Sequence, residues 1–259
     1  MEQTCADPIS GLGDGELAAY LARTAGDLLR DLQRASTDGG LDPTALRDLG
    51  DARSQSYLDN ELRRHRPADA ILSEEAADDE VRLSADRVWI IDPLDGTREY
   101  SEGRDDWAVH VALWAAGDLV AGAVALPGIG IVMDSRAADP MVPPTRDRRL
   151  RLAVSRTRAT PLVRQVAQAL DAELVPMGSA GYKVCAVVRG DVDFYLHSGG
   201  QYEWDSAAPV AVASGYGLHA SRIDGSALAY NQRDSYLPDL LVCGKDIAGP
   251  VLHEISLAM

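Results

Sequence analysis

Apolar residues recur at helical spacing over residues 17–32 and 52–64, and this pattern predicts two long helices. Shorter apolar runs then predict five strands, at residues 70–72, 88–91, 109–114, 119–126 and 130–133. Turn signals around Gly117 and at Pro127-Gly128 join the last four runs into a meander. The first half of the chain is therefore predicted to place two helices beside a largely antiparallel sheet.

A polar, proline-containing loop at residues 136–149 separates this half from a second one. It is a candidate boundary between two subdomains, residues 1–145 and 146–259. In the second half, strands are predicted at residues 151–154, 172–175, 192–197, 240–243 and near 218–220, and helices at residues 160–170, 182–189 and 207–214. Thr160 followed by Pro161 is a typical helix start. The fold class predicted from these elements is α/β with antiparallel character, an α+β arrangement.

The most informative motif follows the strand at residues 88–91, where the chain reads Asp-Pro-Leu-Asp-Gly-Thr. The strand delivers Asp92 and Asp95 to one end of a sheet, and such hard oxygen ligands suit Mg²⁺. Pro93 forces a turn, and Gly96 allows close backbone approach to an anion. A helical turn opening at Thr97 would direct free N–H groups at a phosphate. The alternative interpretation is an acidic turn after an ordinary strand.

Four further acidic residues, at three places in the chain, complete the set of candidate site residues. Glu74 and Glu75 follow the short strand at residues 70–72, although glutamate pairs commonly lie on solvated surfaces. Asp51 precedes one predicted helix and Asp205 precedes another. Taken alone, each of these two aspartates is also a candidate helix N-cap.

Taken together and in order, these motifs resemble the inositol monophosphatase superfamily of Mg²⁺-dependent, lithium-sensitive phosphatases. The resemblance covers nearly the whole chain and is strongest to the bisphosphate nucleotidase type (CysQ type) of actinobacteria. It is carried by residues 72–75, 92–97, 104–110, 178–180 with Lys183, 200–209, 230–231 and 236–240. The fold that this resemblance implies is a layered α-β-α-β-α sandwich with the metal site between its two halves.

The resemblance also implies a role for each acidic residue, with two to three Mg²⁺ ions in one site. Glu74, Asp92 and the backbone carbonyl of Leu94 would hold the first ion. Asp92, Asp95 and Asp205 would hold the second, and Glu74 would face a third, weakly held ion. A separate catalytic pair would position and deprotonate the attacking water, namely Asp51 and Thr97.

The chain departs from the family pattern before the first acid. The usual threonine is missing from the segment between Thr44 and Asp51, and the preceding loop is shorter. Asp48 therefore competes with Asp51, and we prefer Asp51 because its distance to Glu74 matches the family. The altered loop bears on lid closure and on binding of the third ion.

Substrate contacts are implied at two small-residue steps. Gly96 and Thr97 would face the phosphate, and Gly178, Ser179 and Ala180 would let a ribose or inositol ring lie against the backbone. Other candidate contacts each have a structural alternative. Lys183 is either a substrate contact or a solvated helix lysine. Arg156 or Arg158 could bind a second phosphate. The aromatic residues Trp107, Tyr230 and Tyr236 either stack on an adenine or belong to the core.

Composition and net charge limit the classes of partner that the protein is expected to bind. The net charge of −15 and the absence of a basic stripe argue against binding of nucleic-acid polymers, but not of small phosphorylated substrates beside Mg²⁺. No apolar stretch is long enough to span a membrane, and no signal peptide is recognisable. Cys5, Cys185 and Cys243 are predicted to be reduced thiols, the last two buried, in a cytoplasmic protein. A homodimer is compatible with the sequence. His110 is interpreted as a satisfied core residue.

The function implied by the resemblance is Mg²⁺-dependent removal of the 3′-phosphate from 3′-phosphoadenosine 5′-phosphate, a by-product of sulfate activation, giving AMP and phosphate. The alternative within the same chemistry is a phosphatase acting on inositol phosphate, fructose bisphosphate or a nucleoside monophosphate, in a dedicated biosynthetic pathway. A non-catalytic binder with the same fold is disfavoured, because converging carboxylates without metal would repel one another.

Overall fold

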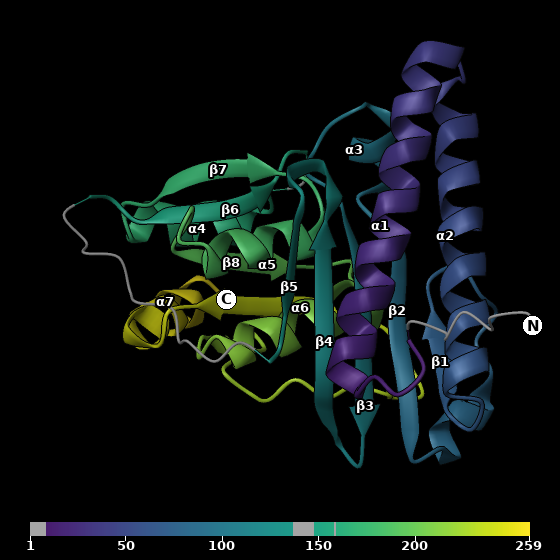
Figure 1. The fold of residues 1–259 in the computed structure, drawn as a ribbon. Helices are drawn as coiled ribbons and strands as arrows, with labels where there is room; N and C mark the ends of the chain where they lie inside the picture. The colour runs from purple at the N-terminus through teal and green to yellow at the C-terminus, as the bar shows by residue number, and fades with distance from the viewer. Residues whose placement is uncertain (1–8, 137–147, 158) are drawn as a thin grey trace, which may run out of the picture.

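Two five-stranded β-sheets form the framework of the protein (Figure 1). The computed structural model describes residues 9–136, 148–157 and 159–259. The strand order is β1-β2-β3-β4-β5 in the first sheet and β7-β6-β8-β10-β9 in the second. Each sheet is built from one half of the chain, so the metal ligands predicted in the two halves must meet between the sheets.

The first sheet contains β1 (Ala70–Ser73), β2 (Arg87–Asp95), β3 (Ala108–Ala115), β4 (Asp118–Leu126) and β5 (Ile131–Asp134). Strand β1 pairs parallel with β2, and β2 to β5 form the predicted antiparallel meander. The expectation that β2 stops at Asp92 is wrong, because the strand continues to Asp95 with a shift in register between these two residues. The irregularity accommodates Pro93, which cannot donate to a regular ladder.

The second sheet contains β6 (Arg151–Ser155), β7 (Glu173–Met177), β8 (Phe194–Ser198), β9 (His219–Ser221) and β10 (Asp239–Cys243). Strand β6 is central and pairs parallel with β7 and β8, whereas β10 runs antiparallel to β8 and β9. Every strand predicted in the second half of the chain is therefore confirmed, with its ends shifted by one or two residues.

The helices are α1 (Asp14–Gly39), α2 (Pro43–His65), α3 (Thr97–Ser101), α4 (Pro161–Ala169), α5 (Ala180–Val188), α6 (Glu203–Gly215) and α7 (Lys245–Ala258), and two 3₁₀ turns lie at Glu80–Ser84 and Pro127–Ile129. Helix α4 is capped as predicted, since the Thr160 hydroxyl accepts from Val163 N. Helix α7 was not predicted, because Pro250 in its interior resembles a helix breaker. Burial of its apolar face, including Val251 and Ile255, outweighs that local penalty.

Three hydrophobic cores hold the layers together. One lies between α1, α2 and the outer face of the first sheet, with Leu21 and Trp89 among its members. A second fills the space between the two sheets around α5 and α6, and a third joins α4 and α7 to the far face of the second sheet. Figure 1 shows these layers in the order helix, sheet, helix, sheet, helix. The predicted layered α-β-α-β-α sandwich is confirmed.

Both predicted N-cap alternatives for the aspartates are wrong. Helix α2 begins at Pro43 and is capped by Asp42, so Asp51 lies in its interior. Asp205 lies in the first turn of α6, where its carboxylate accepts from Tyr202 N at 2.7 Å. Asp205 still takes part in capping α6, as the third residue of a capping box whose N-cap is Tyr202, whereas Asp51 has no capping role.

Several other expectations concern the chain as a whole. Cys185 and Cys243 are buried and free, as predicted, whereas Cys5 lies outside the described residues. The proposed subdomain boundary at residues 145/146 also lies outside them. Among the described residues, no helix combines the length and apolarity needed to cross a membrane.

Candidate active site

A cavity of about 700 Å³ opens between the two sheets. Its walls come from the end of β2, the start of α3, the end of β6, α5, β8 and α6. The predicted site residues that line it are Glu74, Asp92, Leu94, Asp95, Gly96, Thr97, Gly178, Ser179, Ala180, Lys183 and Asp205. Residues from positions 74 to 205 of the chain are thus brought to one place.

The turn at the end of β2 is fixed from two sides. The buried Asp92 carboxylate accepts from Leu94 N at 3.0 Å. From α2, the fully buried Ser54 hydroxyl donates to the Pro93 carbonyl at 2.7 Å. Gly96 follows with a φ of 90°, where a Cβ atom would lie 3.3 Å from Trp107 and Ser179. Glycine is required here both by the left-handed backbone and by this close approach.

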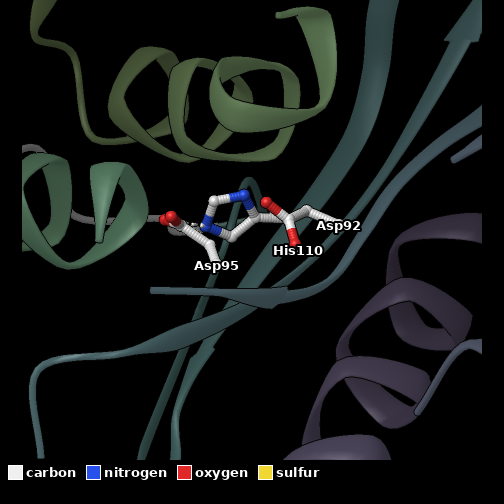
Figure 2. A group of neighbouring side chains, drawn as sticks. All are labelled: Asp92, Asp95 and His110. Atoms are coloured by element: carbon white, nitrogen blue, oxygen red, sulfur yellow. Dashed lines mark ion pairs between the residues drawn. The ribbon is translucent and has the colours of Figure 1, made fainter. Parts of the chain in front are cut away.

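Asp95 is the most constrained carboxylate of the site. Its Oδ2 atom accepts from the Ser179 hydroxyl at 2.5 Å and from Gly181 N at 2.8 Å. His110 Nε2 lies 3.2 Å from the same oxygen (Figure 2). Burial opposes ionisation of Asp95, but the charge and hydrogen bond of His110, together with Lys183, hold its pKa at about 2. Asp95 is therefore a permanent anion at neutral pH.

The other carboxyl groups of the cavity have raised pKa values, in contrast to Asp95. Burial, followed by repulsion from neighbouring carboxylates, raises the pKa of Glu74 to about 7 and that of Asp92 well above its ordinary value. Burial and the nearby Asp95 charge also raise the pKa of Asp205 to about 7. These groups ionise less readily than ordinary carboxyl groups, and nearby positive charge would favour their ionisation, which is the electrostatic character of a cation site.

Asp51 lies on α2 with Glu75 among its charged neighbours, and it does not line the cavity. Burial and the Glu75 charge raise its pKa to about 7, and its Oδ1 atom is buried with no hydrogen-bond partner. The competing Asp48 is exposed and pairs with Arg47 at 2.9 Å. The structure therefore favours Asp51 over Asp48 as a candidate base.

Lys183 is buried, so its interpretation as a solvated helix lysine is wrong. Its Nζ atom donates to the carbonyls of Gly178 at 3.1 Å and Ser179 at 2.6 Å, and lies 5.3 Å from the centre of the Tyr195 ring. Burial lowers the pKa of Lys183 to about 8, although the Asp95 carboxylate favours the charged form. The lysine holds the small-residue turn and adds positive charge to the cavity wall.

The remaining candidate substrate contacts either do not line the cavity or lie outside the described residues. Arg156 does not line the cavity, since its guanidinium pairs with Glu99 at 3.0 Å and Glu102 at 2.8 Å. Arg158 lies outside the described residues. None of the three candidate aromatic residues lines the cavity: Trp107 and Tyr230 are buried in the cores, and Tyr236 is exposed.

Sequence reasoning missed two side chains of the cavity lining, and it placed His110 in the core, where it lies, without its contact to Asp95. Tyr195 and His197 on β8 line the cavity, and His110 on β3 contacts Asp95. The signal for His110 was present in the predicted hairpin, because the antiparallel register places it opposite Asp92. No comparable signal marked the two residues of β8.

Residues 16–254 match the model of the inositol monophosphatase family. The chain belongs to the inositol monophosphatase family. It is 52% identical over 254 residues to a protein of Mycobacterium leprae named 3′-phosphoadenosine 5′-phosphate phosphatase, a match that covers 93% of this chain and 92% of that protein.

Solved structures of this family share the fold. CysQ from Bacteroides thetaiotaomicron aligns with a TM-score of 0.75 at 23% identity, over 90% of this chain and 97% of that one. SaIMPase-II bound to 2′AMP aligns with a TM-score of 0.76 at 18% identity, over 93% of this chain and 97% of that one. At these identities the likeness extends to the architecture alone.

Proposed function

We propose that this member of the family is a Mg²⁺-dependent phosphatase that removes the 3′-phosphate of 3′-phosphoadenosine 5′-phosphate, giving AMP and phosphate. The observation that carries the proposal is the cluster of carboxylates in the cavity, in a chain 52% identical to a relative named for that activity. Three of these four carboxyl groups have raised pKa values and the fourth, Asp95, has a lowered one. Such a cluster has no evident structural purpose, but it matches the needs of a cation-assisted reaction.

The donor set fits Mg²⁺. All the proposed ligand atoms are oxygens: the carboxylates of Glu74, Asp92, Asp95 and Asp205, and the carbonyl of Leu94. Mg²⁺ prefers this chemistry over sulfur or imidazole. Two to three ions sharing these ligands remain our proposal. Bound Mg²⁺ supplies positive charge that neutralises the phosphoryl oxygens and acidifies a nearby water.

The residues of the chain supply positioning and proton transfer. Thr97 begins α3 and lines the cavity, so its hydroxyl and the free N–H groups of that first turn face a phosphoryl group. The hydroxyl can accept a hydrogen bond from the attacking water if its own proton is directed elsewhere. The unpartnered Oδ1 of Asp51, whose pKa of about 7 suits a base at neutral pH, is the acceptor that we propose.

Substrate recognition is assigned to the part of the cavity wall at the start of α5, beside Asp95. There Gly178, Ser179 and Ala180 offer backbone to a ribose ring, and Lys183 adds positive charge for a second phosphate. A Cβ atom at residue 178 would lie 2.3 Å from the Glu99 side chain, so this step must stay small. Arg158 remains a proposed contact from the sequence alone. The division into subdomains 1–145 and 146–259, a homodimer and a cytoplasmic location also remain proposals.

A second candidate within the same chemistry is a phosphatase of inositol phosphate or of a nucleoside monophosphate. It is favoured by two structures of one protein of similar fold, SaIMPase-II, one bound to inositol monophosphate and the other to 2′AMP. The substrate is therefore the part of the proposal that most needs an experiment.

Phosphate release with Mg²⁺ should be measured for 3′-phosphoadenosine 5′-phosphate, inositol 1-phosphate, fructose 1,6-bisphosphate and nucleoside 5′-phosphates. We expect a preference for the first of about a hundredfold in kcat/KM, equivalent to about 2.7 kcal/mol of transition-state binding. A flat profile, or a preference for a monophosphate, would support the second candidate. Asp92→Asn should abolish turnover on every substrate, and near-normal activity would contradict the metal assignment.

A further inference from the structure

His110 lies on β3, fully buried, between the two halves of the site. Its Nε2 atom is 3.2 Å from Asp95 Oδ2, and its Nδ1 atom is 3.0 Å from the backbone carbonyl of Trp204. Figure 2 shows the ring between the Asp92 and Asp95 side chains. The Nδ1 contact is a hydrogen bond to an oxygen that can only accept, whereas the Nε2 contact with Asp95 is an ion-pair distance that does not meet hydrogen-bond geometry.

These contacts argue against His110 as a direct metal ligand. Asp92, Asp95 and His110 lie close enough to be considered a metal-binding group. Because Nδ1 is hydrogen-bonded to the Trp204 carbonyl and Nε2 faces Asp95 Oδ2 at 3.2 Å, however, we assign both ring nitrogens to protein oxygens and not to a cation. It can influence a bound ion only through the groups that it holds in place.

The group held most directly is Asp95. Its Oδ2 atom already faces three donors, from Ser179, Gly181 and His110. Oδ1 is therefore the oxygen that remains for a cation. The second group is the start of α6, because Trp204 precedes the candidate ligand Asp205. One imidazole thus connects a ligand on the first sheet with the helix that carries a ligand from the other half of the chain.

We propose that His110 is a positioning residue, which turns Oδ1 of Asp95 toward the metal position and holds the first turn of α6 at a fixed distance from it. This inference rests on the proposed function, since it assumes that the cavity binds Mg²⁺. A residue of this kind contributes without touching substrate or ion.

The packing around the ring supports the proposal independently. Gly181 in α5 lies against the imidazole, and a Cβ atom there would come within 2.0 Å of Nε2. The absence of a side chain at residue 181 therefore lets the ring reach Asp95, while the backbone N–H of the same residue donates to the same carboxylate. The contacts of Gly181 N and His110 Nε2 with Asp95 Oδ2 therefore depend on each other geometrically.

Two substitutions of His110 separate its two contacts. The amide nitrogen of Gln reaches the position of Nε2 and can donate to Asp95, whereas that of Asn reaches the position of Nδ1 and can donate only to Trp204. We would measure Mg²⁺ affinity by isothermal titration calorimetry without substrate, together with thermal unfolding. We expect His110→Gln to bind Mg²⁺ within about threefold of the wild-type affinity, and His110→Asn about 10- to 100-fold more weakly.

A purely structural role would lower the unfolding temperature of both variants without separating their Mg²⁺ affinities. Equal affinities of His110→Gln and His110→Asn, whether normal or reduced, would overturn the inference. Gly181→Ala provides a second variant if His110→Asn does not fold; it should weaken Mg²⁺ binding by displacing the ring, and unchanged affinity would overturn the inference too. If the wild-type protein binds no Mg²⁺, the proposed function itself fails, which is a different result.

Discussion

Removing the charge of Asp205 should stabilise the metal-free protein at alkaline pH. Asp205 is a partly buried candidate ligand, and burial with the Asp95 charge raises its pKa from 3.8 to about 7. Each tenfold change in proton affinity is worth about 1.4 kcal/mol, so ionising this carboxyl in the folded state costs about 4 kcal/mol. Asn carries no such cost, and its side-chain oxygen can still accept from Tyr202 N.

The sign of the pH dependence follows from the raised pKa. Between pH 3.8 and 7 the folded state binds this proton more tightly than the unfolded state, so stability is lost as pH rises through that window. The cost is about 2 kcal/mol at pH 5 and reaches its full value of about 4 kcal/mol above pH 7. The advantage of Asp205→Asn over wild type should therefore be larger at pH 8 than at pH 5.

Urea unfolding in EDTA at pH 5 and pH 8 would measure this difference as a free energy of unfolding. Asp118→Asn is the matched control, because it removes one negative charge from an exposed residue at the start of β4 that does not line the cavity. With saturating Mg²⁺ the wild-type protein should recover stability and the variant should gain less, since ligand binding to the folded state adds stability. An Asp205→Asn protein that is less stable than wild type at pH 8, or equally favoured at both pH values, would refute the reasoning.

Lys183→Met should lower kcat/KM for bisphosphates about tenfold more than for monophosphates, equivalent to about 1.4 kcal/mol; equal losses would remove the lysine from specificity. Ser54→Ala should lower the free energy of unfolding in urea by about 1–3 kcal/mol by leaving the Pro93 carbonyl unpaired. Ser56→Ala, on the exposed face of the same helix, should change it by no more than about 0.5 kcal/mol. Lithium should inhibit phosphate release at sub-saturating Mg²⁺ and lose its effect in excess Mg²⁺; insensitivity would point to an altered segment before Asp51. Mg²⁺ binding at pH 7 should release protons, seen as a buffer-dependent calorimetric enthalpy that disappears at pH 9.

The elements of the fold follow largely from local patterns. Helix α1 and the meander β2 to β5 have regular apolar periods that their tertiary contacts only reinforce. Helix α7 escaped prediction because Pro250 lies in its interior, and a buried apolar face far from it in sequence decides the outcome. The end of β2 was misplaced for a related reason, since the pairing of Asp95 with Ala108 depends on a neighbouring strand.

Site residues that belong to a sequence motif could be predicted from the sequence. Residues whose role depends on burial in the folded protein could not. The acids of the motif around Asp92 could be identified without coordinates. The environment of Lys183 could not, because a lysine in a short helix carries no signal that its Nζ will lie inside a cavity wall. His110 is intermediate: its alternation marks it as buried, but its partners on β2 and α6 appear only once the two halves meet.

The contrast between Asp95 and its neighbours explains why stability and cation binding should be linked in this protein. The chain surrounds Asp95 with donors and with the cations His110 and Lys183, so this carboxylate is ionised and fixed before any cation arrives. For Glu74, Asp92 and Asp205, burial and the charges of neighbouring carboxylates outweigh the hydrogen bonds and cations nearby, so the pKa of each is raised. If the cavity binds a cation as we propose, Asp95 would fix its position, and the three carboxyl groups with raised pKa values would supply affinity, because a cation would relieve their mutual repulsion.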